Sequence, residues 1–400
     1  MLKLLNARLI DGTGAAPQDG ASVLLDGSRI AAVYGPGSAP PTSDDPAIDL
    51  HGRTLLPGLI NAHIHILMDD TAGDSFASVT RLSLPELALH GAVRGRRMLE
   101  AGITTARELG GYEYVEMALR DSFARGEFPG PRLLCAGKII TMTGGHGWPL
   151  GRQADGADEV RKAVREQLRA GADVIKLMAT GGVLTPGVEP GAAQLTEDEL
   201  RAGIEEAHRA DRRTASHAQG TTGVKNAIRA GIDTIEHGIF LDDEAVEMMR
   251  DRGVVLVPTL AAPYQIVVAG EARGIPAYAV EKSRRVMEAH FESFKRAHAA
   301  GVTIAAGNDG GTPFNPAPDL VTELRLMITH GMSAIEALRT AGYGSAVALG
   351  LADEIGTVQA GKQADLLVLD GDPLADIAAL GWPWLVLKGG QVVYRAAGDH

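Results

Sequence analysis

The chain has little cysteine, no long apolar run and no excess of basic residues, and each shortage excludes a class of protein. Its single cysteine, Cys135, excludes an internal disulfide framework and a zinc site built from thiolates. No apolar run approaches the roughly 18 residues that a membrane-spanning helix needs, so we expect none. The segment Met1–Ile10 reaches polar residues at once and lacks the apolar core of a signal peptide.

The charge balance is acidic, with 38 Lys and Arg against 50 Asp and Glu and a net charge of -12. Nucleic acids and anionic membranes both require a basic face, so we expect neither as a partner. Hydrophobic residues make up 45% and charged residues 22%, which is enough for a large core and argues against disorder. We therefore expect a globular, cytoplasmic protein that acts on a small molecule, with enzymes as the leading class.

The 50 glycines are numerous, and many follow one pattern: an amphipathic stretch, a glycine, and a short β-branched run. The pattern is centred on Gly102, Gly171, Gly231, Gly253 and Gly301. It predicts a helix ended by a left-handed glycine and followed at once by a buried strand. Thr196 and Glu199 have the spacing of a capping box at the start of one such helix. Helices that alternate with short apolar strands are typical of a parallel α/β sheet.

We identify eight candidate strands in the middle of the chain. They span residues 59–66, 103–109, 132–137, 173–178, 214–218, 234–238, 254–259 and 303–309. Eight βα units over this length predict a closed (β/α)8 TIM barrel. An open, doubly wound sheet is the alternative, but it is weakened because no strand is followed by a glycine-rich dinucleotide turn.

The two ends of the chain carry short strands of another style, joined by turn residues. They are predicted at residues 4–9, 22–26, 29–34, 365–369, 385–388 and 391–394. Neither end alone has enough strands for a stable sheet, so we expect one small β-sandwich domain built from both termini. The predicted division is residues 1–56 and 356–400 for the β-sandwich and 57–355 for the barrel.

Unusual polar side chains fall toward the carboxyl ends of the predicted barrel strands, where barrel enzymes build their active sites. His63 and His65 are two residues apart on one strand, so both point to the same face. The others are Lys176, His217, His237 and Asp309. A metal site explains why such groups converge from different strands.

Each residue also has a plain structural interpretation. A single histidine at a strand end is more often a hydrogen-bonded core residue than a ligand. Lys176 would alone be a strand-end residue reaching solvent, and Asp309 could cap a helix. The metal hypothesis is favoured because all six groups coincide at one end of the predicted barrel.

Several motifs, taken in order, resemble the amidohydrolase superfamily. They are Leu56-Pro-Gly-Leu-Ile-Asn-Ala-His-Ile-His65, Ile175-Lys-Leu-Met-Ala-Thr-Gly-Gly182, Ser216-His-Ala-Gln-Gly220, Ile235-Glu-His-Gly238 and Asn308-Asp309. Within it, the chain is most similar to the imidazolonepropionase-like branch, which contains Xaa-Pro dipeptidases, N-acyl amino acid carboxypeptidases and ochratoxin-degrading amidases. The resemblance covers nearly the whole chain. Asn308 stands where the superfamily more usually has Thr. This departure concerns the neighbour of the ligand Asp309 and not the ligand itself.

The resemblance implies a centre with two divalent metal ions, usually zinc. His63, His65 and Asp309 would hold one ion, and His217 and His237 the other. Lys176, carboxylated to a carbamate, would bridge them. Two such ions together activate water for attack on a carbonyl, and Asp309 would carry its proton to the leaving amine.

The substrate is predicted less directly. His146, in a loop after the third strand, and Tyr264, in a loop after the seventh, are candidate contacts to a substrate carboxylate or oxyanion. Either could instead be an ordinary solvated or packed loop residue. We interpret the remaining histidines as structural or surface residues, namely His51, His90, His208, His290, His298, His330 and His400.

We therefore predict a homo-oligomeric hydrolase that cleaves the amide bond of a dipeptide or N-acyl amino acid with a free carboxylate. The alternative substrate is a cyclic amide or imide, such as a hydantoin- or imidazolone-like ring. A third, remote reading is a non-catalytic scaffold with the same fold.

Overall fold

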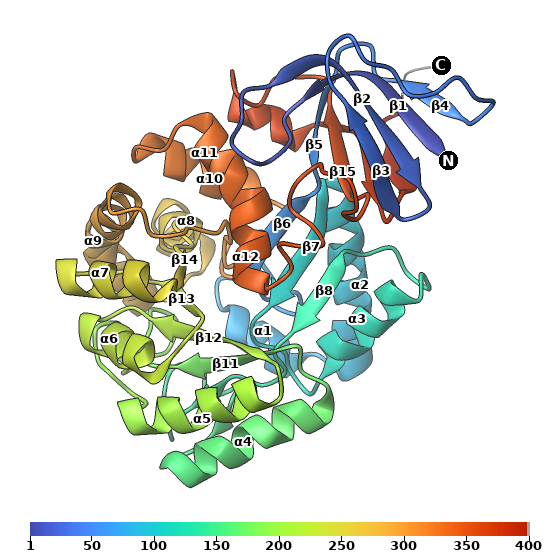
Figure 1. Ribbon diagram of the computed structural model, residues 1–400. Helices are drawn as coiled ribbons and strands as arrows, with labels where there is room; N and C mark the ends of the chain where they lie inside the picture. The colour runs from blue at the N-terminus through green and yellow to red at the C-terminus, as the bar shows by residue number, and fades with distance from the viewer. Residues whose placement is uncertain (398–400) are drawn as a thin grey trace.

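The structure, a computed structural model, describes residues 1–397 as an α/β fold in which helices surround parallel strands (Figure 1). One parallel sheet has the order β6-β7-β8 and the other the order β10-β9-β11-β12-β13-β14. The strands are β6 (Leu59–Ile64), β7 (Ile103–Glu108), β8 (Arg132–Cys135), β9 (Ile140–Thr141), β10 (Arg152–Gln153), β11 (Val174–Met178), β12 (Arg213–Ala218), β13 (Thr234–His237) and β14 (Val255–Val257).

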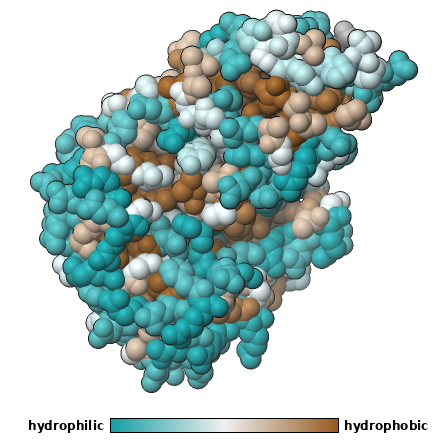
Figure 2. Space-filling model, in the orientation of Figure 1, coloured by the Kyte–Doolittle hydropathy of each residue, from teal (hydrophilic) through white to brown (hydrophobic). Residues whose placement is uncertain are grey.

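Twelve α-helices lie in the part of the chain that the structure describes. They are α1 (Ser75–Arg81), α2 (Leu84–Glu100), α3 (Val115–Ala124), α4 (Ala157–Ala170), α5 (Glu197–Arg209), α6 (Thr221–Ala230), α7 (Asp243–Arg252), α8 (Ala261–Ala269), α9 (Ala277–Ala299), α10 (Leu320–Thr329), α11 (Ala334–Arg339) and α12 (Ser345–Leu349). None of those searched is long and apolar enough to cross a membrane. Hydrophilic residues cover most of the outer faces of α4 to α7 in the view of Figure 2.

Seven of the eight predicted barrel strands coincide with observed strands, but the prediction of a regular eighth strand at residues 303–309 is wrong. That segment makes only isolated bridges, from Ile304 to Leu256 in β14 and from Gly310 to Ile64 in β6. Asp309 has a left-handed backbone (φ 55), which interrupts the extended conformation that a ladder requires. The segment still lies between β14, at one edge of the larger parallel sheet, and β6, at one edge of the smaller one.

The predicted helix ends are confirmed. Gly171, Gly231 and Gly253 cap α4, α6 and α7 in the left-handed conformation, with φ of 97, 99 and 67. Thr196 and Glu199 form the capping box of α5, in which each side chain bonds to the other's backbone. After each of these helices, the next strand begins within a few residues.

The strands from the two ends of the chain join in one mixed sheet of eight strands (Figure 1). They are β1 (Leu2–Leu9), β2 (Gln18–Asp26), β3 (Arg29–Tyr34), β4 (Ala47–Asp49), β5 (Thr54–Pro57), β15 (Leu366–Leu369), β16 (Pro383–Lys388) and β17 (Gln391–Arg395). The ends meet where β5 pairs antiparallel with β15. The expected association of both termini is thus observed as a sheet, whereas the two-layer sandwich and the domain boundaries stay predictions.

Glu116, on α3, is a carboxyl group buried in the core beside the end of β7. Neither of its carboxylate oxygens has a hydrogen-bond partner among the described residues. It fits there because Gly111 has no side chain: a Cβ on Gly111 would lie 1.8 Å from the Glu116 Cδ. Burial, together with the charge of Glu108, raises the pKa of Glu116 to about 8.

This pKa predicts that the protein loses stability as the pH rises from about 4.5 to about 8, because the native state there holds a proton that the unfolded state has released. Glu116→Gln removes this titration with little change of shape. Measured by urea unfolding, the free energy of unfolding of the wild type should fall by roughly 1.4 kcal/mol per pH unit within that window, relative to that of the variant. An identical pH dependence in both proteins would show that Glu116 is already ionised in the native state.

Candidate metal centre and its pocket

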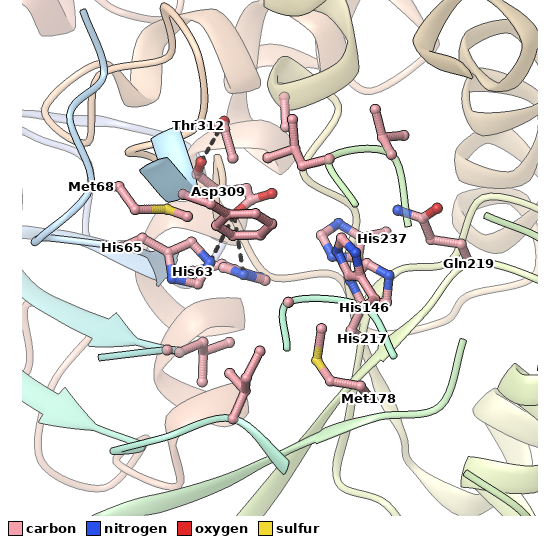
Figure 3. A pocket seen from close by; sticks show the side chains of 18 of the residues that line it. His63, His65, Met68, His146, Met178, His217, Gln219, His237, Asp309 and Thr312 are labelled. Atoms are coloured by element: carbon pink, nitrogen blue, oxygen red, sulfur yellow. Dashed lines mark hydrogen bonds and ion pairs between the residues drawn. The ribbon is translucent and has the colours of Figure 1, made fainter. Parts of the chain in front are cut away.

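All six predicted ligand residues line one pocket of about 750 Å³ at the carboxyl ends of the parallel strands. They come from the end of β6, from β11, β12 and β13, and from the segment after residue 303: His63, His65, Lys176, His217, His237 and Asp309. Figure 3 shows five of them in two groups, with His63, His65 and Asp309 on one side and His217 and His237 facing them. The structure thus brings all six side chains to one pocket, and their role as metal ligands stays a prediction.

His63, His65 and Asp309 form a compact cluster. The Oδ1 atom of Asp309 lies 3.3 Å from Nε2 of His63 and 3.2 Å from Nε2 of His65. The potential ligand atoms of the three residues all lie within 4.8 Å of one another. Although burial opposes ionisation, the two imidazoles hold the pKa of Asp309 well below its usual range. An anionic oxygen beside two ring nitrogens is a donor set that suits a divalent metal ion such as zinc.

Lys176 lines the same pocket, interacts electrostatically with His63 and with His237, and is 2% exposed. Its Nζ atom has no hydrogen-bond partner in the described part of the chain. Burial lowers the pKa of this amine to about 8. A buried, unpartnered ammonium is costly, so the site favours the neutral amine or a chemically modified lysine that can bind a cation.

His217 and His237 are each held through one ring nitrogen. Nε2 of His217 donates to the Gly181 carbonyl at 2.8 Å, and Nδ1 of His237 lies 2.7 Å from the Thr259 hydroxyl. Their ring centroids are 4.5 Å apart. Outer contacts of this kind orient imidazole ligands and leave the second nitrogen of each ring available to a metal.

His63 is oriented by a buried ion pair that the sequence analysis missed. Its Nδ1 donates to Glu236 at 2.8 Å, and the other Glu236 oxygen accepts from Arg107 at 2.8 Å. Arg107 also donates to the Ala62 carbonyl and to Thr234. Despite burial, Arg107 and His63 lower the pKa of Glu236 to about 2. The only sequence signal was the placement of Arg107 and Glu236 inside predicted buried strands.

The backbone of Asp309 is strained and is held by amide side chains. Asn315 donates to the carbonyls of Asn308 and Asp309 at 2.5 and 3.1 Å. Asn61 donates to the Asn308 side chain at 2.8 Å. Asn308, which departs from the usual residue of the superfamily, therefore supports the loop that presents Asp309 and does not itself line the pocket.

The two predicted substrate contacts are placed differently. His146 lines the pocket, with its ring centroid 4.4 Å from that of His217 and its Nδ1 2.8 Å from the Thr185 hydroxyl. Burial lowers the pKa of His146 to about 3. Tyr264 lies on α8 and not in a loop, packs against the hydrophobic core, and is not among the residues that line the pocket.

Besides Thr312, two further polar residues line the pocket, and the sequence analysis assigned neither a catalytic nor a binding role. His290, predicted to be structural or at the surface, lies on α9 and faces the pocket. Gln219, which follows β12, lines the same cavity (Figure 3). Helical periodicity in α9 identifies a buried face but cannot show that this face borders a cavity. The prediction for His400 lies outside the described residues.

Comparison with known proteins agrees with this geometry. Residues 54–393 match the sequence profile of the amidohydrolase family. Ochratoxinase from Aspergillus niger is 32% identical over 376 residues, covering 84% of this chain and 75% of that protein. Imidazolonepropionase from Sphingopyxis alaskensis is 27% identical over 94% of both chains. The solved structure of a Xaa-Pro dipeptidase with bound methionine in the active site is 30% identical, covers 99% of this chain and 100% of that one, and has a TM-score of 0.89.

The Arg107–Glu236 pair predicts a strong asymmetry between single and double variants. Arg107→Leu should lower the free energy of unfolding by about 3–5 kcal/mol, because it leaves the Glu236 carboxylate buried without its charged partner. The double variant Arg107→Leu/Glu236→Leu should recover most of that loss. Urea unfolding of the wild type, the two single variants and the double variant measures the coupling energy. A double variant as unstable as Arg107→Leu would contradict the prediction.

Proposed function

The chain belongs to the amidohydrolase family and is therefore a hydrolase; from this premise we propose that it uses metal ions to cleave the amide bond of a dipeptide or an N-acyl amino acid with a free carboxylate. The observation that carries the proposal is that two facing imidazole groups and the unpartnered Lys176 amine line one largely apolar pocket. The Xaa-Pro dipeptidase structure and ochratoxinase support the choice of an amide substrate.

The donor set fits two divalent ions, for which zinc is our choice. His63, His65 and Asp309 would hold one ion and His217 and His237 the other, with Lys176 as a bridging carbamate. The buried, unpartnered Nζ of Lys176 supports this assignment, as does Oδ1 of Asp309, which lies beside the ring nitrogens of both His63 and His65. Bound there, such ions would supply a water of lowered pKa and would polarise the scissile carbonyl.

The chain's own residues would bind the substrate and move the proton. Asp309 is ionised and would accept a proton from the attacking water and pass it to the leaving nitrogen. Gly147 donates to the Thr185 hydroxyl at 3.1 Å, so the hydroxyl proton is available to Nδ1 of His146. His146 would then present Nε2–H to a substrate carboxylate or oxyanion. Apolar side chains such as Phe76 and Ile266 would exclude water from the bond being cut.

Hydrolysis of a cyclic amide or imide is the second candidate, and the charge of the pocket favours it. Among residues 1–397, Lys176 and Asp309 are the only Lys, Arg, Asp or Glu residues that line the pocket. A substrate without its own charge would need no further ionic partner. The similarity to imidazolonepropionase agrees with this alternative.

Several structural expectations accompany the proposal. We infer that the two parallel sheets close into a (β/α)8 barrel, since residues 304 and 310 bridge β14 and β6. The domain division at residues 56 and 356, the terminal β-sandwich, the homo-oligomer and the cytoplasmic location also stay predictions.

The metal assignment predicts about two divalent ions per chain after zinc reconstitution. Lys176→Ala should lose most of this metal, because the bridge supplies a ligand to both ions. Metal analysis after gel filtration measures the content, and Lys295→Ala, at an exposed lysine on α9, is the matched control. Full metal content in Lys176→Ala would exclude the bridge.

The substrate assignment is tested with an N-acyl amino acid and its matching carboxamide. His146→Ala should lower kcat/KM on the free acid about ten- to a hundredfold, the worth of a charge-assisted hydrogen bond, with metal content unchanged. The loss on the carboxamide should be far smaller. Equal losses would assign His146 to the fold or to the carbonyl, and a wild type that prefers the carboxamide would favour the cyclic-amide candidate.

A further inference from the structure

Gln219 and His290 are polar groups of the pocket wall that the proposed mechanism does not use. Gln219 is 5% exposed and His290 is fully buried. Oε1 of Gln219 and Nδ1 of His290 both lack a hydrogen-bond partner among residues 1–397. Buried polar atoms are nearly always paired, so two unpaired ones that border the same cavity indicate that a ligand or water completes them.

The contacts of His290 define which of its nitrogens is the acceptor. Its Nε2 lies 2.7 Å from the Pro258 carbonyl and 3.1 Å from the His237 carbonyl. A carbonyl oxygen only accepts, so Nε2 carries the proton and donates to both. No carboxylate among the described residues pairs with this ring, which therefore stays neutral with a lone pair on Nδ1.

Both residues are bonded to the chain at the end of β13. The backbone carbonyl of Gln219 accepts from the Phe240 N–H at 2.9 Å, and Nε2–H of His290 donates to the carbonyl of His237. The surrounding wall is apolar and includes Ile239 and Ile266. Two acceptors in an apolar wall match a ligand that is mostly apolar but carries a hydrogen-bond donor.

We propose that Oε1 of Gln219 and Nδ1 of His290 form a subsite that accepts hydrogen bonds from an uncharged N–H or O–H group of the substrate. The inference rests on the proposed amide hydrolysis and deepens it. The donor is uncharged because Asp309, the only acidic residue of the described chain that lines the pocket, belongs to the metal cluster, so an ammonium group would have no counter-ion there. The substrate class is thus an N-acyl amino acid whose apolar acyl group carries a neutral donor.

Three probes that share one scissile bond test the subsite. They are acetyl-leucyl-phenylalanine, its ester analogue in which oxygen replaces the acetamido N–H, and the free dipeptide leucyl-phenylalanine. Wild-type kcat/KM for leucyl–phenylalanine cleavage should be about tenfold higher for the acetylated peptide than for the ester analogue, because the analogue leaves the acceptors unpaired. The free dipeptide should also be cleaved more slowly than the acetylated peptide, because its ammonium group would be desolvated in the pocket.

Matched variants separate the subsite from general packing. Gln219→Met keeps the length of the side chain without its amide acceptor, and His290→Leu removes Nδ1 without adding another acceptor. Both should bring the ratio between the peptide and its ester analogue close to one. Gln219→Glu should raise the rate on the free dipeptide relative to the acetylated peptide, because a carboxylate pairs with its ammonium.

An unchanged ratio in both Gln219→Met and His290→Leu would overturn the subsite, even if all three probes are cleaved. If none is cleaved, the proposed function fails, and the dissociation constants of the same probes, measured by calorimetry, decide the subsite separately. If the wild type binds the acetylated peptide about tenfold more tightly than its ester analogue, and both variants lose this preference, the subsite is supported. Equal affinity for the peptide and its ester analogue would refute it.

Discussion

The buried ion pair between Arg107 and Glu236 is the contact on which the rest of the site depends. Both side chains are almost wholly buried, and together they join β7 to β13, while Arg107 also bonds to the carbonyl of Ala62 in β6. Such a pair gains little net stability, since desolvation offsets its attraction. Its effect is geometric: Glu236 accepts from Nδ1 of His63 and so directs Nε2 toward Asp309.

Local strain is concentrated around the same cluster. His237, Thr259 and Asp309 all have positive φ, at 75, 54 and 55, although none is glycine. Each such residue costs about 1–3 kcal/mol and persists only where its surroundings hold it. Here the Thr259 hydroxyl meets the ring of His237, and Asn315 binds the carbonyl of Asp309. The strain is consistent with side chains presented to a ligand.

The pocket walls are held by two ionisable side chains from α9 and α10. Lys282 on α9 donates to the carbonyls of Thr185 and Val188, which ties down the loop that follows β11. Glu323 on α10 accepts from the backbone N–H groups of Leu260 and Ala261 at the start of α8. The apolar residues of the wall are therefore preorganised, and binding needs to order little of the chain.

The sequence alone determined the alternation of helix and strand, because a left-handed glycine ends a helix whatever surrounds it, as at Gly171 and Gly231. It also determined that His63, Lys176 and the other polar strand-end residues converge, since parallel strands end at a common edge. Only the tertiary structure decided which partner each buried group meets. In the folded chain Arg107 pairs with Glu236 and His290 lines the pocket. Tyr264 packs against the hydrophobic core. The physical reason is that periodicity specifies which face of an element is buried, whereas the packing of distant elements decides whether that face meets a side chain or a cavity.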